Sequence, residues 1–194
     1  MEQNYEGKVA ENGCNNGREW VDLGLSVKWA TCNIGADSPE CYGEYFAWDE
    51  TKPKSEYTES NYSSNRRFVD VYWVEDIMRF TDVAKKEWGG NWRVPTKAEC
   101  EELVNDCEWI WTSLRGVKGY KVIGKNGNSI FLPAAGWKTE TRHLYEGVGA
   151  RYWSSTAYEN SYQYAFYLSY VGDFVYEVGM GQRYRGQTVR PVCD

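Results

Sequence analysis

The segment that follows Pro95 carries the most specific structural signal in this chain. Thr96 and Glu99 form a T-x-x-E capping box, in which each side chain accepts a hydrogen bond from a backbone N–H at the start of a helix. Small and apolar residues then recur at i, i+3, i+4 and i+7, the spacing of one helix face. These residues are Cys100, Leu103, Val104 and Cys107. The pattern predicts a helix that buries this stripe, with both of its cysteines as buried thiols.

After residue 107 the hydrophobic period becomes two, which is typical of strands. Asn126-Gly127 divides the alternating segment 120–132, and this dipeptide is the strongest short signal for a β-hairpin. Gly172-Asp173 divides the segment 164–178 in the same way. The other expected elements are a short helix at 82–89 and short strands at 19–23, 27–31 and 188–192. Short antiparallel strands, two helices and long loops together indicate an α+β fold.

Two stretches show no clear period. Residues 1–18 are polar and rich in glycine and asparagine, so we expect a loose N-terminal segment. Residues 32–65 form a long loop, a type that is usually functional or packed by its own aromatic side chains. The aromatic residues embedded in its first half are Tyr42, Tyr45, Phe46 and Trp48. A length of 194 residues with 42% hydrophobic residues predicts one domain over 1–194.

The charge of the chain argues against nucleic acid as a partner. The formal net charge is -6, and the basic residues are scattered rather than gathered in a stripe. The sequence has no run of about 18 apolar residues, so we expect no membrane span. The N-terminus has no charged and then apolar signal-peptide pattern, which fits either a protein that is not exported or one whose leader has been removed.

The residue types that carry catalysis are sparse. His143 is the only histidine, it lies in a polar stretch, and no G-x-S-x-G motif accompanies it, so we interpret it as a surface residue. Adjacent carboxylates such as Glu101-Glu102 point apart and do not form an acid/base couple. C-x-x-C and EF-hand motifs are absent from the sequence. We therefore expect a protein that is not an enzyme and that uses no metal and no cofactor.

Two further motifs are expected to be structural. Cys32 and Cys41 flank the turn-rich loop NIGADSPE, so we expect them to lie close together, where they could bridge in an oxidising compartment. The G-x-G fragments at 147–149 and 179–181 lack the strand-to-helix context of a phosphate loop and are expected to be plain loops.

The C-terminal third of the chain is rich in tyrosine. Seven tyrosines lie between residues 158 and 184, at positions 158, 162, 164, 167, 170, 176 and 184. Tyrosine provides a large, stiff, amphipathic contact area, as in antibody loops. Alternation places Tyr167 on one strand face with Ala165, as framework. The residues expected to form one exposed ligand-binding patch, at turns and strand ends, are Tyr158, Glu159, Tyr162, Tyr170, Asp173, Met180, Gln182 and Tyr184.

Six segments occur in the order found in a known family. They are EWVDLGLSVKWATCNIGA (19–36), YGEYFAW (42–48), WGGNWRVPTKAECEEL (88–103), GNSIFLPAAG (127–136), YWSST (152–156) and VRPVC (189–193). Together they resemble the Fibrobacter succinogenes major paralogous domain of Bacteroidetes surface proteins. That group is similar to the C-type-lectin-like variable proteins that retroelements diversify in bacteria and phages.

The resemblance implies a C-type-lectin-like fold, with paired N- and C-terminal strands and two helices beside a sheet. It also implies no catalytic activity and a candidate ligand-binding region at 152–193. The fixed framework would be Tyr152 to Thr156, Ala165 to Leu168 and Arg190 to Val192. Trp153 and Arg190 are therefore expected to support the fold rather than to contact ligand.

The chain departs from related groups at specific positions. In many retroelement targets the variable codons cannot encode Glu, Gln or Met, which argues against active diversification by that route here. The candidate segment nevertheless contains Glu159, Gln163, Glu177, Met180 and Gln182. Formylglycine-generating enzymes share the fold but need a reactive cysteine pair in the C-terminal region, where this chain has only Cys193. The E-P-N and Q-P-D triplets of calcium-dependent lectins do not occur.

The sequence thus predicts a recognition protein whose partner is a protein or glycan on another cell or on a host surface. It would be extracellular, at a cell surface or on a virion. The alternative is a structural or assembly domain that uses the same aromatic face for contacts between copies. A measurement of oligomeric mass discriminates between the two.

Overall fold

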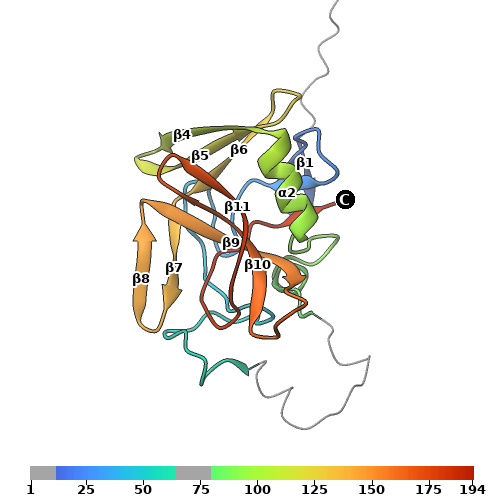
Figure 1. The fold of residues 1–194 in the computed structure, drawn as a ribbon. Helices are drawn as coiled ribbons and strands as arrows, with labels where there is room; N and C mark the ends of the chain where they lie inside the picture. Colours follow the sequence, from blue (N-terminus) through green and yellow to red (C-terminus); the bar gives the residue numbers. More distant parts are fainter. Residues whose placement is uncertain (1–11, 64–79) are drawn as a thin grey trace, which may run out of the picture.

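The computed structural model describes residues 12–63 and 80–194. Two helices, α1 (Val83–Trp88) and α2 (Lys97–Asp106), accompany three β-sheets (Figure 1). The four-stranded sheet has the order β1-β2-β3-β12, with β1 (Asn12–Asn15), β2 (Arg18–Val21), β3 (Lys28–Ala30) and β12 (Val192–Cys193). The three-stranded sheet has the order β4-β5-β6, with β4 (Glu108–Leu114), β5 (Val117–Ile123) and β6 (Ser129–Pro133).

The five-stranded sheet is the largest and carries most of the C-terminal third. Its order is β11-β10-β9-β7-β8, with β7 (Ala135–Thr139), β8 (Arg142–Glu146), β9 (Gly149–Ala157), β10 (Tyr164–Val171) and β11 (Phe174–Gln182). Its pairings are antiparallel except that of β7 with β9, which are parallel at Gly136 and Ala150. The short antiparallel strands and two helices confirm the predicted α+β class.

Helix α2 begins with the predicted capping box. The Thr96 hydroxyl accepts a hydrogen bond of 3.3 Å from the Glu99 backbone N–H, and the Glu99 carboxylate accepts one of 2.7 Å from the Thr96 N–H. Cys100 and Leu103 are buried, as the stripe predicts. Cys107 is only half-buried, because it is the C-cap residue and its backbone has already left the helical conformation. The prediction of two buried thiols is therefore correct for Cys100 alone.

Both predicted hairpins are present. Ile123 pairs with Ser129 around the Asn126-Gly127 turn, and Val171 pairs with Phe174 around Gly172-Asp173. Strands β1, β4, β7, β8 and β9 were not predicted. The glycines at 179 and 181 lie within β11 and Gly149 lies within β9, so the prediction that these glycines form plain loops was wrong.

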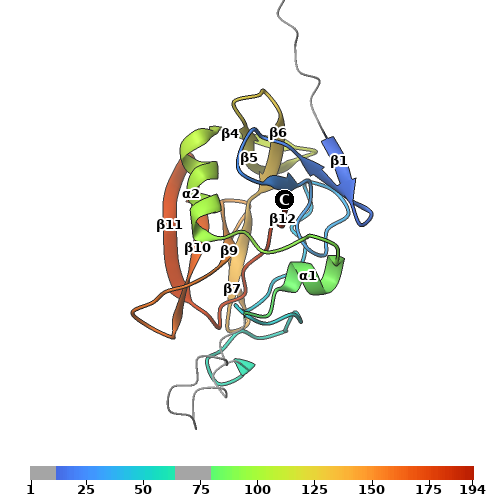
Figure 2. The ribbon, with the colours of Figure 1, turned by 90° about the vertical axis from the view of Figure 1, so that its right-hand side faces the viewer.

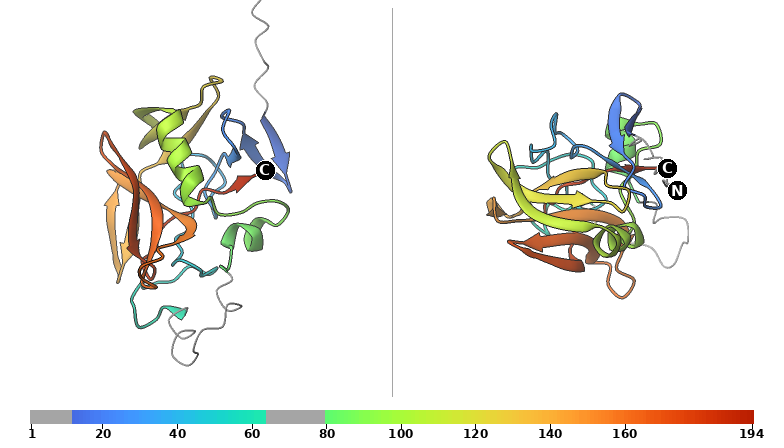
Figure 3. Two further views of the ribbon diagram at one scale, coloured as in Figure 1. Left: turned by 45° about the vertical axis from the view of Figure 1, so that its right-hand side comes forward. Right: turned by 90° about the horizontal axis from the view of Figure 1, so that it is seen from above.

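The two ends of the described chain meet in one sheet. Val192 of β12 pairs with Trp29 of β3, which joins the C-terminal strand to the N-terminal ones (Figure 3). The final strand is shorter than the predicted 188–192. The segment predicted to be loose, 1–18, lies partly outside the described residues. Its described part is not loose, because Asn12 to Asn15 form β1 and pair with β2.

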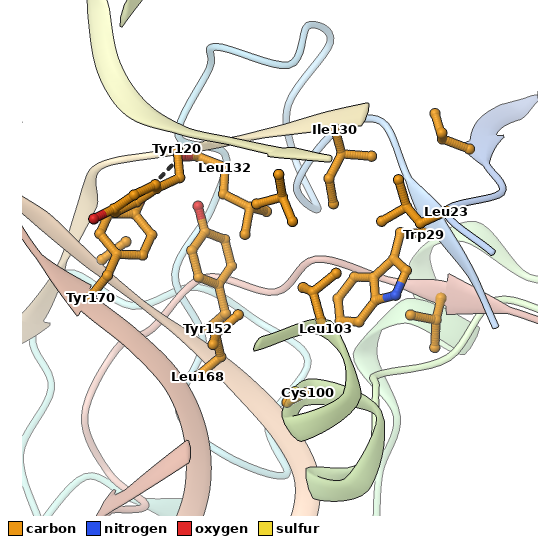
Figure 4. Packing of buried hydrophobic residues seen from close by; sticks show 14 of the residues in the cluster. Leu23, Trp29, Cys100, Leu103, Tyr120, Ile130, Leu132, Tyr152, Leu168 and Tyr170 are labelled. Atoms are coloured by element: carbon orange, nitrogen blue, oxygen red, sulfur yellow. Dashed lines mark hydrogen bonds between the residues drawn. The ribbon is translucent and has the colours of Figure 1, made fainter. Parts of the chain in front are cut away.

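The five-stranded sheet separates two hydrophobic cores. Helix α2 lies against one face of this sheet (Figure 2). Tyr152 and Leu168 on that face pack into a core beneath α2, and this core includes Leu103, Trp29 and residues of the three-stranded sheet (Figure 4). Trp153 and Tyr167 on the other face pack into a second core. Adjacent strand residues point to opposite faces, so β9 and β10 supply both cores. The central strands are thereby held rigidly from both sides.

The long segment after β3 packs through its own aromatic residues. Tyr45, Phe46 and Trp48 are all buried, and Tyr57 and Tyr62 lie in the same region. The segment contains no α-helix and no strand between residues 31 and 62, apart from isolated bridges. For the described part of the segment, 32–63, this agrees with the predicted long loop that is packed by its own aromatic side chains.

Candidate functional site

The predicted contact residues do not form a single patch. Strand β10 is 8 residues long, so its two ends lie roughly 23 Å apart at about 3.3 Å per residue. Asp173 lies at the turn that ends the hairpin, whereas Gln182 pairs with Tyr164 at the opposite end. The other predicted residues, apart from Tyr170, gather at the Gln182 end. Asp173 is exposed, but it belongs to a separate place on the surface.

Tyr170 is buried, and its prediction as a contact residue was wrong. Its side chain is 0% exposed, and its hydroxyl donates a hydrogen bond of 2.7 Å to the Leu132 carbonyl (Figure 4). Tyr170 lies two residues after Leu168, so both point to the face beneath α2. Desolvation in this core raises the pKa of Tyr170 well above its usual value.

We define the hairpin-end surface as the group of predicted residues at the Gln182 end: Tyr158, Glu159, Tyr162, Met180, Gln182 and Tyr184. Tyr162 is 56% exposed and Met180 is 48% exposed, so both large side chains present about half of their surface to solvent. Glu159 is exposed as well. Tyr158 is half-buried, with its ring edge-to-face with Phe166 at 5.7 Å. The surface thus presents two apolar or aromatic side chains beside a carboxylate.

The polar residues of this surface are held by one another. The Gln182 side-chain oxygen accepts hydrogen bonds from the Tyr184 hydroxyl at 2.9 Å and from Arg185 Nε at 3.0 Å. Tyr184 also packs on the small core around Tyr45 and Tyr57. A cavity of about 40 Å³ lies here, lined by Glu59, Tyr62, Gln163, Gln182, Arg183 and Tyr184. Part of its lining comes from the 57–62 segment, which the sequence did not associate with the C-terminal third.

A row of stacked planar groups crosses the face of the five-stranded sheet that is opposite α2. The rings of Tyr145 and Trp137 are stacked, with centroids 4.5 Å apart and 15° between their planes. The Arg151 guanidinium carbon lies 3.8 Å from the Trp137 centroid and 4.6 Å from that of Tyr167. We call these four residues the stacked row. They come from β8, β7, β9 and β10 in spatial order.

Two glycines of β11 make room for the last ring of the row. A Cβ added at Gly181 would lie 2.7 Å from a ring carbon of Tyr167, and one at Gly179 would lie 3.1 Å away. The ring of Tyr167 therefore lies flat over the β11 backbone. Any larger residue at 181 displaces this ring, and with it one side of the Arg151 stack.

Arg151 differs from the other described arginines because its side chain makes no hydrogen bond and no ion pair within the described residues. Four arginines pair with carboxylates, namely Arg18, Arg93, Arg115 and Arg142. Arg190 is fully buried and donates to Asn33 and to three backbone carbonyls. Burial, together with repulsion from Arg185, lowers the pKa of Arg151 from its usual value.

Further polar groups without partners lie near Arg151. Ser169 pairs directly with Arg151 across β9 and β10, so the two side chains share one face. Thr188 pairs with Tyr152, which places the side chain of Gln187 on the Arg151 face. The Gln187 amide and the Trp137 indole nitrogen are buried without a hydrogen-bond partner within the described structure. Buried polar groups are nearly always paired, and of the four described residues with such an unpaired atom Gln187 and Trp137 lie on this face, whereas Trp29 and Glu40 lie elsewhere.

Tyr145, at the outer end of the row, has a left-handed backbone. Its φ is 58° and its side chain is 49% exposed. A bulky residue in this conformation is strained, and such residues cluster at functional sites. The sequence reasoning missed the whole row, because its members converge only through the pairing of four strands. The single local signal was a cation, Arg151, at an alternating position between Ala150 and Tyr152.

His143 lies in β8 and is half-buried, rather than in a surface loop as predicted. Its Nε2 is 2.7 Å from the Ala135 carbonyl oxygen and 3.0 Å from the Tyr45 hydroxyl, and its Nδ1 is 3.0 Å from the Glu146 carboxylate. The described residues place no nucleophile among these partners. The arrangement fits a structural histidine that ties β8 to the 45–48 segment.

Comparisons with protein-family models, with curated proteins and with solved structures found no match.

Within residues 12–63 and 80–194, no group of three or more His, Cys, Asp or Glu side chains is arranged to hold a metal ion. Neither of the two described helices has the length and apolar character required to cross a bilayer. Cys32 and Cys41 are free thiols, without the disulfide that an oxidising compartment could allow. Each sulfur lies beside a hydroxyl of its own segment instead, Cys32 at 3.6 Å from Thr31 and Cys41 at 3.1 Å from Ser38.

Proposed function

We propose that this chain is a recognition protein, without catalytic activity, that binds a ligand through the hairpin-end surface and the adjoining stacked row. The observation that carries the proposal is the contrast between a rigid framework and the side chains that it presents. Trp153 and Arg190 are 2% and 1% exposed, whereas Tyr162 and Met180 are about half exposed. Exposed aromatic and thioether side chains on a rigid support are typical of binding surfaces.

We also propose a C-type-lectin-like fold for the chain. Three features support it: the pairing of β12 with β3, the packing of α2 against β9, β10 and β11, and the burial of the framework segments. Under this proposal 152–193 is the ligand-binding region and 1–194 is one domain. The expected partner is a protein or glycan on another cell or on a host surface. The protein would act outside the cell, at a cell surface or on a virion.

One observation favours the alternative of an assembly domain. Strand β11 is an edge strand, and it exposes Phe174 by 66% as well as Met180 by 48%. An exposed apolar edge strand is a site at which a second copy can pair. Assembly through β11 predicts a stable oligomer, and light scattering after size exclusion reads its mass. A monomer at micromolar concentration supports recognition of a different partner.

The recognition proposal is tested by screening. Labelled protein is applied to a glycan array and to intact bacterial and host cells, in parallel with Met180→Ala and Ile110→Ala variants. Ile110 is 41% exposed on β4 of another sheet and serves as the matched control. We expect saturable binding that Met180→Ala weakens at least tenfold and Ile110→Ala leaves unchanged. Saturable binding with equal affinity in all three proteins would place the ligand elsewhere on the molecule.

A further inference from the structure

The guanidinium of Arg151 lies against two aromatic rings. Trp137 covers one of its faces at 3.8 Å and Tyr167 lies 4.6 Å away on another side, while the residue as a whole remains partly exposed. A guanidinium stacked between rings keeps its N–H groups in plane and free to donate. The N–H donors point away from the ring faces, so a partner must approach edge-on. The group best suited to that approach is a planar oxyanion, which accepts two parallel hydrogen bonds.

The surroundings of Arg151 also favour an anion. Arg185 is near enough for its positive charge to lower the pKa of Arg151. Among the described residues Arg185 donates a hydrogen bond to Gln182 but forms no ion pair. The Ser169 hydroxyl lies on the same face as an additional donor. A partly buried cation that is repelled by a second cation and has no ion-pair partner is unfavourable until an anion neutralises it. No described carboxylate fills that role, although the chain as a whole has a net charge of -6.

A ligand suited to this surface would carry few charges and would have a flat, partly apolar side. An overall charge of -6 repels polyanions such as nucleic acids, which need a basic stripe. The exposed ring of Tyr145 is separated from Arg151 only by the Trp137 ring. Exposed aromatic rings offer an apolar face on which the C–H side of a sugar ring can pack. A row of planar groups with one cation therefore suits an oligosaccharide with an acidic unit better than a compact ion.

We propose that Arg151, with Arg185 and Ser169 beside it, binds the carboxylate of a uronic acid unit in an oligosaccharide whose neighbouring sugar packs on Tyr145. This inference rests on the proposed recognition function and names the ligand class for one part of that surface. The left-handed backbone of Tyr145 is part of the site, because it holds the tyrosine ring against Trp137 at the open end of the row.

The test uses a matched pair of probes: a neutral oligosaccharide ending in one glucuronic acid, and its methyl ester. Isothermal titration measures both against the wild type, Arg151→Gln, Arg151→Lys and Arg115→Gln. Arg115 pairs with Glu40 at the β4–β5 turn, in a different sheet, and is the control. We expect the ester to bind the wild type at least tenfold more weakly than the acid. Arg151→Gln should remove that difference, Arg151→Lys should retain part of it, and Arg115→Gln should leave it unchanged.

Several outcomes would overturn the inference. Equal affinity for acid and ester, equal affinity of Arg151→Gln and wild type, or no binding of the acid at millimolar concentration each contradict it. A peptide with a free C-terminal carboxylate is tested in the same way. If this peptide binds more tightly than the sugar and its binding depends on Arg151, the ligand is a protein and not an oligosaccharide. Melting temperatures of all variants separate loss of binding from loss of folding. If the screen finds another ligand that depends on Met180 but not on Arg151, the recognition function stands and only this inference fails.

Discussion

The Tyr170 hydroxyl donates a hydrogen bond of 2.7 Å to the Leu132 carbonyl and thereby ties the five-stranded sheet to the three-stranded one. Tyr152 makes the equivalent bond to the Pro133 carbonyl, also at 2.7 Å. Both hydroxyls are buried, so the two bonds satisfy polar groups that water does not reach. The junction of the two sheets is therefore fixed by side chains from consecutive strands, β9 and β10.

Tyr170→Phe is expected to destabilise the protein without weakening ligand binding. The change removes the hydroxyl donor and leaves the Leu132 carbonyl buried without its partner, at a cost of about 1–3 kcal/mol. Urea denaturation measures the loss, and titration of any ligand found in the screen measures binding. Tyr162→Phe is the matched control, since Tyr162 is 56% exposed and should lose little stability. If Tyr170→Phe keeps full stability but binds ligand poorly, Tyr170 is a ligand-contact residue and not part of the framework.

Elements with local signals were predictable from the sequence. The capping box of α2 and the Asn126-Gly127 and Gly172-Asp173 turns act within a few residues, and the structure contains all three. Strands β7 and β8 carried no comparable signal, because their pairing with β9 depends on the closure of the whole sheet. The alternation that identified Tyr167 as framework also places Tyr170 with Leu168, so burial of Tyr170 was predictable from the same rule.

The stacked row could not be predicted from the sequence. Trp137, Arg151 and Tyr167 are each ordinary strand residues when read alone. Their contacts depend on the order β7-β9-β10 and on the register that sets Arg151 opposite Ser169. No tight turn joins β9 to β10, so their register depends on which faces the packed sheet buries rather than on a short motif. The fold class was therefore more accessible from the sequence than the arrangement of the candidate site.

Glu99→Gln is expected to destabilise the protein at neutral pH but much less in acid. Burial alone would raise the pKa of Glu99, but hydrogen bonds from Arg93 and Thr96 outweigh it and lower the pKa below the ordinary 4.5. A carboxyl with a lowered folded-state pKa adds stability above pH 4.5, and this stability is lost as the pH falls through the folded-state value. The substitution should cost about 1–2 kcal/mol at pH 7. Urea denaturation at pH 7 and pH 3 measures the difference, and an equal loss at both would contradict this account.

The six cysteines are expected to differ in reactivity in the order of their exposure. Cys14 and Cys41 are exposed and should react first with a maleimide in the native protein. Cys100 is buried and its pKa is raised by desolvation, so it should react only after unfolding. Cys107 is intermediate, because partial burial raises its pKa to about 11. Mass spectrometry of peptides at successive times gives the order, and fast labelling of Cys100 would contradict the position of α2.

Ligand binding is expected to be independent of divalent metal ions. The described residues contain no cluster of three or more His, Cys, Asp or Glu side chains that could hold a metal ion, and the surface residues offer aromatic and cationic groups instead. The affinity of the screened ligand should therefore be the same with and without a chelator, in a titration after dialysis. A calcium-binding lectin tested in the same buffers controls for effective chelation. A tenfold or greater loss in the chelator would contradict the expectation.

Contact residues and framework residues are expected to respond in opposite ways to truncation. Tyr162→Ala should weaken binding by ~2 kcal/mol, the cost of removing a central aromatic contact, and should change the melting temperature little. Trp153→Ala should instead destabilise the fold by about 3–5 kcal/mol, because its ring is 2% exposed and packs against Tyr167. Tyr184→Ala is expected to do both in part, since Tyr184 packs on the Tyr57 core and also bonds Gln182. The scan is read by titration and by thermal unfolding of the same samples. If Tyr162→Ala unfolds the protein while the folded fraction binds normally, Tyr162 belongs to the framework and the hairpin-end surface does not contact ligand.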